Sequence, residues 1–266
     1  MYGYGYSAYN RLSFLSVPNA EAKAFFAATG ITDPIIQDAV IVLIQDLKDY
    51  SVWSKMKAIY PFVGGTATTH KFNLVNPLDT DGAFRLSFNG GWTHSANGVL
   101  PNGTNGYADT FLTPSTTLTL NSTHISFYSR TNIANTGSDL GSANANFANG
   151  LYITPRYTDG NSYSRINGNN IQYISAGSLG YFVGSRTSSS VARIFQNNTL
   201  RATDTLSSTG LNNFSLNVGA LNVGGTRNYS NRQLAFATIG DGLTNTEASN
   251  LYTAVQKFQT TLGRQV

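Results

Sequence analysis

The sequence has no cysteine and few charged residues of either sign. Charged side chains make up 11% of the 266 residues, against about a quarter in ordinary soluble proteins. Without cysteine the chain has neither a disulfide framework nor a thiolate metal site, so folding depends on the packed core alone. Because charge is scarce, Asn, Ser, Thr, Gly and Tyr must cover the surface, and such surfaces suit packed assemblies or sugars.

The chain also lacks the charge pattern of a nucleic-acid-binding protein and the apolar run of a membrane protein. Its 17 bases exceed its 13 acids by only four, and they are scattered without a run or a helical stripe. The most apolar stretch, residues 35–47, is interrupted by polar side chains and is too short to span a bilayer. No basic segment followed by an apolar one opens the sequence, which predicts no secretory signal. We therefore expect no nucleic acid and no membrane as partner.

Glutamate is nearly absent, which argues against a glycosidase. Glu21 and Glu247 are the only glutamates, whereas glycosidases that use paired carboxylates present two acids at one groove. The predicted sandwich has six aspartates before its closing strand: Asp79, Asp81, Asp109, Asp139, Asp159 and Asp204. Only Asp79 and Asp81 lie close together, in a turn where Asp side chains ordinarily bond their own backbone. The alternative for this pair is a calcium site, although calcium needs six or more oxygens. With no Gly-x-Ser-x-Gly elbow, we predict that the chain is not an enzyme.

The three histidines give no metal signature. His70, His94 and His124 do not have the spacing of metal ligands, and a structural role is predicted for them. No helix is predicted to follow the Gly-Gly pairs at 64–65 and 90–91, and a phosphate site needs the dipole of such a helix. No metal site and no cofactor is therefore predicted.

The last stretch of the chain predicts a strand that leads into a capped helix. The nearly unbroken apolar run at 234–239 is followed by Gly-Asp-Gly, and then Thr244 and Glu247 have the spacing of a capping box. Gly263 supplies a left-handed stop. The helix must lie on an apolar surface, because apolar residues recur along it at helical spacing. These residues are Ala248, Leu251, Tyr252, Val255, Phe258 and Leu262.

Two helices are predicted near the start of the chain. Asn19 caps the first, at 20–29, and Gly30 ends it. Asp33 and Pro34 open the second, whose wide apolar face runs to Leu47 and is extended through one further turn to about residue 56. The pattern then changes to strand character at 58–63. We therefore place the boundary between a helical attachment, 17–56, and a β-sandwich, 57–266, near residue 57.

The rest of the chain reads as short strands separated by Gly, Asn and Ser clusters. About twelve strands without interposed helices favour a mostly β, two-sheet antiparallel jelly-roll sandwich with the helices packed outside. The Asn197-Asn198 pair predicts a two-residue hairpin turn, since Asn tolerates positive φ. The predicted strands lie at residues 71–75, 83–88, 117–120, 124–129, 150–154, 163–166, 171–174, 180–185, 191–195, 199–203, 214–221 and 234–239.

Residues 88–110 form the most plausible recognition loop. The candidate ligand-binding residues are Trp92, His94, Tyr107 and Asp109. An exposed Trp92 or Tyr107 can stack on the apolar face of a sugar while Asn and Asp side chains bond its hydroxyls. The alternative, which large aromatics at strand ends favour, is that Trp92 is a core anchor and the asparagines only supply turns.

The first sixteen residues alternate Tyr with Gly and have too few aliphatic side chains for a core of their own. One interpretation is a disordered tail. Another is an arm that orders on a neighbouring subunit of a homo-oligomer, and a third is that the sandwich offers its own groove for the segment. The candidate assembly residues are Tyr2, Tyr4, Tyr6, Tyr9 and Phe14.

Several segments together resemble a family of bacteriophage virion proteins found in tail, fibre or head-decoration positions, with a concanavalin A-like (laminin G-like) jelly-roll domain. The segments are Trp53 to Ala67, His70 to Leu74, Phe88 to His94, Asn121 to Arg130 and Arg232 to Thr244. The resemblance covers about residues 31–266. It implies a non-enzymatic virion component that assembles with other virion subunits and is made in the bacterial cytoplasm. It also implies an alternative function, recognition of a host-surface glycan.

Overall fold

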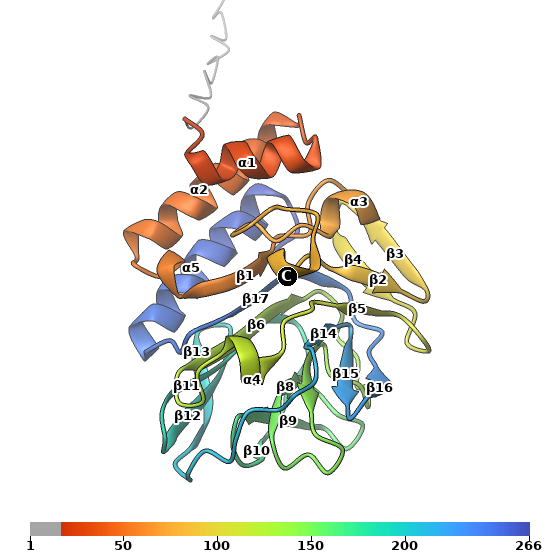
Figure 1. Cartoon of the computed structure of the whole chain (residues 1–266), viewed down its shortest axis with the longest axis vertical. Helices are drawn as coiled ribbons and strands as arrows, with labels where there is room; N and C mark the ends of the chain where they lie inside the picture. Colours follow the sequence, from red (N-terminus) through yellow and green to blue (C-terminus); the bar gives the residue numbers. More distant parts are fainter. Residues whose placement is uncertain (1–16) are drawn as a thin grey trace, which may run out of the picture.

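Residues 17–266 are described by the computed structural model, and they form three layers: a layer of helices, an eight-stranded sheet and a nine-stranded sheet (Figure 1). Three long helices make up the first layer, and short helices and 3-10 turns lie in the connections. The long helices are α1 (Ala20–Thr29), α2 (Pro34–Asp49) and α5 (Asn245–Thr261); the short elements are η1 (Trp53–Lys55), α3 (Ala67–His70), η2 (Asp81–Ala83) and α4 (Pro114–Thr117).

The helix boundaries confirm the predicted caps. The Asn19 side chain accepts a hydrogen bond from the backbone N–H of Ala22 at 2.9 Å, and Gly30 ends α1 at φ 69°. Asp33 caps α2 in the same way, directly before Pro34. These caps satisfy N–H groups that the first turn of a helix leaves without partners.

The capping box of α5 is confirmed, and it also ties the helix to the turn before the first strand. The Glu247 backbone N–H donates to Thr244 Oγ1, and the Thr244 backbone N–H donates to Glu247 Oε2 at 2.8 Å. The same carboxylate pairs with Lys55 Nζ at 2.7 Å. Gly263 follows the helix at φ 65°.

The eight-stranded sheet has the order β13-β12-β11-β6-β17-β4-β3. The remaining strand, β1, pairs with the C-terminal half of β17, from Ala237 to Gly240. All of its pairs are antiparallel. Its strands are β1 (Met56–Tyr60), β3 (Trp92–Ser95), β4 (Gly98–Pro101), β6 (Thr123–Ser129), β11 (Gly180–Ser188), β12 (Val191–Gln196), β13 (Thr199–Asp204) and β17 (Leu234–Gly240).

The nine-stranded sheet has the order β10-β9-β8-β7-β14-β5-β2, with the β15–β16 hairpin beside β7. Its pairs are antiparallel except for β15 with β7. Its strands are β2 (Ser87–Asn89), β5 (Tyr107–Asp109), β7 (Leu140–Ala143), β8 (Gly150–Thr154), β9 (Asn161–Ile166), β10 (Ile171–Ile174), β14 (Asn217–Val218), β15 (Ala220–Val223) and β16 (Thr226–Tyr229). The mostly β, two-sheet sandwich predicted from the sequence is confirmed.

Two apolar cores hold the layers together. One lies between the sheets and is built from alternate residues such as Phe127 on β6 and Ile153 on β8. The other lies between the helices and the outer face of the eight-stranded sheet, and it contains Phe236 and Tyr181 of the sheet together with buried residues of α2 and α5. The long helices therefore cover one sheet, and the outer face of the nine-stranded sheet is left for other contacts.

Most of the predicted strands in the second half of the chain are confirmed. The bounds of β8 and β10 are those predicted, and β6, β9, β11, β12, β13 and β17 differ by three residues or fewer at either end. Asn197 and Asn198 have φ of 47° and 64° and form the two-residue turn of the β12–β13 hairpin.

The strand predicted at 71–75 is wrong. Residues 67–70 form α3, and the following segment is irregular although it lies beside β1. The Asn73 side chain takes the place of strand pairing there, since its Oδ1 accepts from the Ile59 N–H and its Nδ2 donates to the carbonyls of Lys57 and Ala83. Residues 71–75 therefore have the alternating apolar pattern of a strand, but they do not pair in a sheet.

Three other predicted strands are wrong or shortened. Pro114 begins the short helix α4, which replaces a strand at 117–120. The strand at 83–88 is reduced to β2, because Phe84 lies in the left-handed region at φ 58°. The strand at 214–221 is divided at Gly219, where φ of 76° lets the chain reverse between β14 and β15.

The predicted loop at 88–110 contains the end of β2, the β3–β4 hairpin and β5. These strands are three or four residues long, and Gly and Asn flank them, so their sequences resemble turns. β7 and β16 were missed for the same reason.

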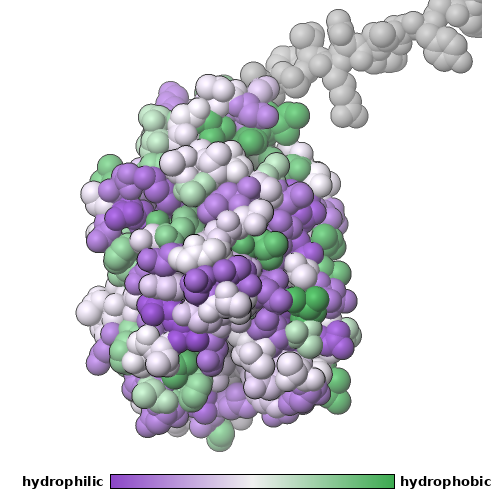
Figure 2. Space-filling model, turned by 90° about the vertical axis from the view of Figure 1, so that its right-hand side faces the viewer, coloured by the Kyte–Doolittle hydropathy of each residue, from purple (hydrophilic) through white to green (hydrophobic). Residues whose placement is uncertain are grey.

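The face of the molecule shown in Figure 2 mixes hydrophilic and hydrophobic residues without one large hydrophobic area.

The predicted division at residue 57 falls where η1 passes directly into β1, and it stays a proposal. The predicted arm, with Tyr2, Tyr4, Tyr6, Tyr9 and Phe14, lies outside the described residues. Among residues 17–266 no helix has the length and apolar character needed to cross a membrane.

Candidate functional site

A hollow of about 370 Å³ lies on the outer face of the nine-stranded sheet, and four aromatic rings line it. Strands β8, β9, β15 and β16 and the loops beside them supply its residues. We call this hollow the aromatic pocket. Its lining residues are Thr136, Phe147, Tyr152, Thr154, Tyr157, Tyr163, Leu221 and Asn228.

The alternation of the strands places two of the rings. Leu151 and Ile153 point into the core between the sheets, so Tyr152 between them points outward. Tyr163 on β9 pairs in register with Thr154 on β8 and shares the same outer face. A β-carbon at Gly141, the partner of Tyr152 on β7, would collide with the tyrosine, so glycine is needed to seat this ring.

Phe147 reaches the pocket from the loop between β7 and β8. Its ring meets that of Tyr152 edge to face, with centroids 6.3 Å apart. Its backbone has φ of 59°, an uncommon conformation for a bulky residue. Strain of this kind persists only where surrounding contacts hold it, and it is concentrated at binding and catalytic sites.

Tyr157 and Tyr163 form the other half of the aromatic wall. Their rings meet edge to face at 5.6 Å, and the Tyr163 hydroxyl donates a hydrogen bond of 2.6 Å to Asp159 Oδ2. This bond lowers the pKa of Asp159 below its usual value and raises the pKa of Tyr163. The Tyr163 hydroxyl is thereby fixed and its ring oriented.

Few polar side chains line the pocket, and two of them form no hydrogen bond within residues 17–266. Thr154 is buried, and its hydroxyl bonds that of Ser138 at 2.6 Å. Thr136 and Asn228 are exposed, and their side chains have no hydrogen-bond partner among residues 17–266. No lining side chain carries a charge. The arrangement suits an uncharged ligand with an apolar face for the rings and hydroxyl groups for the rim.

The sequence-predicted residue Trp92 lies on β3, away from the aromatic pocket. Its ring is half-buried and meets Phe88 edge to face at 5.1 Å, and its indole N–H donates to the Asn89 carbonyl at 2.9 Å. It packs against the core between the sheets. Its outer edge lines an open hollow of about 510 Å³ with Asn102 and other β3–β4 residues.

His94, two residues further along β3, contacts His70, which was also predicted to be structural. Its Nδ1 lies 3.0 Å from Nδ1 of His70, and its ring meets Phe88 at 4.6 Å. Burial lowers the pKa of both histidines, that of His70 to about 3. The pair is therefore neutral at physiological pH.

Tyr107 and Asp109 lie on β5, on the outer face of the nine-stranded sheet. The Arg227 guanidinium covers the Tyr107 ring at 3.7 Å, and Asp109 Oδ1 accepts a hydrogen bond from the Phe111 N–H at 2.8 Å. The structure thus separates the four predicted residues into one pair on each sheet. Ligand binding by either pair stays a prediction.

Sequence analysis missed the aromatic pocket, although a signal was present. Tyr152, Tyr157 and Tyr163 occur within twelve residues, on both sides of a Thr-Asp-Gly-Asn turn. Two aromatics on the same face of neighbouring strands, with a third in the connecting turn, predict one aromatic face. Phe147 had no such signal, because a loop of small polar residues places it.

The two aspartates considered for calcium, Asp79 and Asp81, form ion pairs with basic side chains of the protein. Asp79 pairs with Lys71 Nζ at 2.5 Å and with Arg85 at 3.5 Å, and Asp81 pairs with Arg85 at 2.8 Å. Within residues 17–266 no group of three or more acidic or histidine side chains is arranged to hold a metal ion.

No protein-family model and no curated protein matches the chain. Among solved structures, the binding domain of botulinum neurotoxin serotype D is similar over 76% of this chain and 52% of that one, with a TM-score of 0.51 and 10% identity. Domain 4 of AbnA, a GH43 extracellular arabinanase from Geobacillus stearothermophilus solved with arabinotriose, is matched over 74% of this chain and 98% of that one (TM-score 0.43, 13% identity). NanB sialidase from Streptococcus pneumoniae is matched over 52% and 25% (TM-score 0.40, 15% identity).

The chain therefore spans about half of the neurotoxin domain and about a quarter of the sialidase. At these identities the likeness to the neurotoxin domain shows a shared β-sandwich fold and nothing further, and the two lower TM-scores carry no argument. The sandwich implied by the resemblance to phage proteins is present. A virion role is not among what these comparisons show.

Proposed function

We propose that the chain is a non-catalytic carbohydrate-binding module and that the aromatic pocket binds the sugar. The observation that carries this proposal is the set of four aromatic rings around one hollow on a sheet face that the long helices leave uncovered. Aromatic rings stack on the apolar face of a sugar ring, and the free groups of Thr136 and Asn228 lie where its hydroxyls would be.

The preferred ligand is an uncharged glycan. No Lys or Arg lines the pocket, and the Asp159 carboxylate beside Tyr163 is held in its charged form by hydrogen bonds. A sugar carboxylate would find no cation among the lining side chains and would be repelled by Asp159. A cation outside the lining, Arg165, lies beside the pocket and bonds Tyr152. Two of the similar structures are an arabinanase domain in complex with arabinotriose and a sialidase, but the proposal does not depend on them.

The test compares variants of two tyrosines, Tyr163 and Tyr107, on a glycan array. Calorimetry then measures the affinity of each variant for the best ligand. Tyr163→Ala is expected to weaken binding by about tenfold or more, because it removes one stacked ring worth about 1.4 kcal/mol. Tyr163→Phe keeps the ring, loses only the bond to Asp159, and is expected to stay within about threefold of the unaltered protein.

Tyr107→Ala is the matched control, because Tyr107 is a half-buried tyrosine of the same sheet outside the pocket. It separates the aromatic pocket from the site predicted by sequence. Loss of binding in Tyr107→Ala with full binding in Tyr163→Ala would move the site to β5. An array on which only acidic glycans bind would contradict the uncharged class.

The virion structural role stays a second prediction, carried by the resemblance and by the Tyr-Gly segment outside the described residues. Its finer parts are assembly through residues 1–16, a homo-oligomer and location in the virion. Electron cryomicroscopy of assembled particles would test all three together, and a chain that is absent from particles would remove them.

A further inference from the structure

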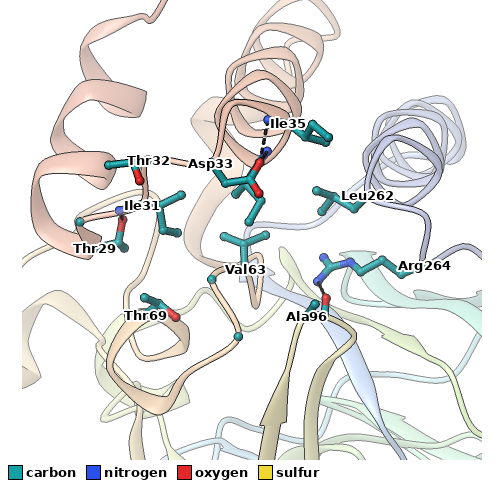
Figure 3. Close-up of a pocket in the computed structure, with 14 residues that line it drawn as sticks. Thr29, Ile31, Thr32, Asp33, Ile35, Val63, Thr69, Ala96, Leu262 and Arg264 are labelled. Carbon is teal, nitrogen blue, oxygen red and sulfur yellow. Dashed lines mark hydrogen bonds between the residues drawn. The ribbon is translucent and has the colours of Figure 1, made fainter.

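A second hollow, of about 540 Å³, lies between the helical layer and the sandwich (Figure 3). The α1–α2 junction forms one side, the segment after β1 and the β3–β4 turn form the floor, and the residues after α5 close the other side. The side chains of Asp33, Val63 and Leu262 surround its centre. We call it the junction pocket.

The walls of the junction pocket are aliphatic. Ile31 and Val63 are nearly fully buried at its base, whereas Ile35 at its rim is 60% exposed. Ile36 and Leu262 add further apolar surface, and no aromatic side chain takes part. This lining differs from that of the aromatic pocket, and it offers apolar contact without a stacking surface for a sugar.

Two charged groups at the pocket differ in what they can still bind. Arg264 closes the floor, and its guanidinium donates to four backbone carbonyls, among them those of Phe62 at 2.8 Å and Ala96 at 3.4 Å. Asp33 is exposed, and its Oδ1 accepts from the backbone N–H groups of Ile35 and Ile36. Asp33 has no ion-pair partner within residues 17–266, so it can still pair with a cation.

We propose that the junction pocket binds the chain's own residues 11–15, Arg-Leu-Ser-Phe-Leu. Arg11 would pair with Asp33, while Leu12, Phe14 and Leu15 would cover Ile31, Ile35, Val63 and Leu262. Arg11 is the only charged residue in the first sixteen, and it stands next to the only aliphatic and phenylalanine side chains of that stretch apart from Met1 and Ala8. Its charge and the apolar group beside it match the pocket.

The length of chain fits docking within one molecule. The ten residues of α1 cover about 15 Å along the helix axis, and the pocket lies at the end of α1 that contains Thr29 and Gly30. Six residues from Val17 back to Arg11 span up to about 20 Å when extended. A chain that turns back at Pro18 and runs along α1 therefore brings Arg11 to Asp33.

Docking within one molecule is also favoured by concentration. A segment tethered by a linker of this length is present near its site at an effective concentration of about millimolar, well above that of a second copy. Of the three interpretations of the N-terminal segment, the proposal follows the one in which the segment lies in a groove of its own molecule. The junction pocket is that groove. It removes Phe14 from the residues expected to contact a neighbouring subunit.

A cysteine pair tests the proposal directly, because the chain has no cysteine of its own. Ser13→Cys is combined with Thr32→Cys, since Thr32 is an exposed polar residue that lines the pocket. The control combines Ser13→Cys with Gln172→Cys, which is exposed on β10, far from α1 in Figure 1. Both proteins are oxidised mildly at low concentration, and the products are separated on non-reducing gels and mapped by mass spectrometry.

The expected result is a disulfide within one chain that forms about tenfold faster in the first protein than in the control. Adding Asp33→Asn or Arg11→Gln should slow it about two- to fivefold, and the two changes together should slow it no more than either alone, because both remove one ion pair. Disulfides only between chains, or equal rates in the two proteins, would overturn the proposal.

Discussion

The three histidines of the chain are placed where protonation is unfavourable. His124 is fully buried, its Nδ1–H donates to the Asp241 carbonyl at 2.6 Å and its Nε2 accepts from the Thr238 hydroxyl at 3.0 Å. The Gly65 N–H donates to Nε2 of His70, so Nδ1 of His70 must carry the proton that bonds His94. The bonds of His70 and His94 require neutral rings, and burial disfavours the charged form of His124. Both facts agree with the structural role that the sequence predicted.

The free energy of unfolding is therefore expected to fall as the pH is lowered from about 7 toward 4. Burial lowers the pKa of His70 to about 3 and that of His124 to about 4, from an unfolded value of 6.5. Below pH 6.5 the unfolded chain binds protons that the folded chain does not, so each histidine adds a slope of up to about 1.4 kcal/mol per pH unit. The stability is fully present above pH 6.5 and is lost progressively below it.

Urea unfolding at pH 7, 6 and 5 measures this slope. His124→Gln and His70→Gln remove one titrating ring each, and each variant should show a shallower loss than the unaltered protein whatever its starting stability. Parallel pH profiles in all three proteins would show that these histidines titrate equally in the folded and unfolded states.

At the scale of single residues, the sequence identified caps and turns better than ligand contacts. The side chains of Asn19, Asp33 and Thr244 act on backbone groups two or three positions away, so local spacing determines them. Asn73 bonds residues up to sixteen positions away. Its role depends on β1 lying beside it, which no local pattern contains.

At the scale of elements, α5 shows how an apolar stripe finds its surface. Phe258 is 2% exposed, its ring lies 5.8 Å from that of Phe236 on β17, and Arg264 lies over it at 5.4 Å. The predicted face of the helix is thus the buried one. The missed strands β3, β4, β5, β7 and β16 lack such a stripe, because each is only three or four residues long.

Phe258→Ala is expected to lower the free energy of unfolding by about 3 to 5 kcal/mol, because it leaves a cavity between α5 and β17. Thr253→Ala on the exposed side of the same helix should change it by less than about 0.5 kcal/mol. Both values come from urea or thermal unfolding. An unchanged melting temperature for Phe258→Ala would contradict the docking of α5.

At the scale of the whole molecule, the sequence predicted the sandwich and its outer helices, but not how closely they are joined. Hydrophobic periodicity indicates that α2 needs a partner surface, and it does not indicate which face of which sheet provides it. In the structure α2 and α5 pack side by side on the outer face of the eight-stranded sheet. The aromatic pocket could not be predicted in full for the same reason, since it joins residues 136 to 228 across four strands.

Removal of residues 1–56 tests whether the helical part is separable. The shared core takes eleven of its buried residues from that part. Burial of each of the larger ones is worth about 1.5 to 3 kcal/mol, so their sum is as large as the whole stability of a typical domain, about 5 to 15 kcal/mol, or larger. The eleven residues are Ala22, Phe25, Ile31, Ala39, Val40, Ile41, Leu43, Ile44, Leu47, Val52 and Met56.

A chain of residues 57–266 would expose Tyr181 and Phe236 on the bare sheet, and it is expected to aggregate or to lose cooperative thermal unfolding. Residues 17–266 serve as the control, and they should unfold in one transition within a few degrees of the full chain, because they keep every buried residue that the structure describes in the two cores. Calorimetry and near-ultraviolet circular dichroism measure the two outcomes. Cooperative unfolding of residues 57–266 at an unchanged temperature would instead make the helices a separable attachment, as the sequence predicted, and would assign the stability of the molecule to the core between its sheets.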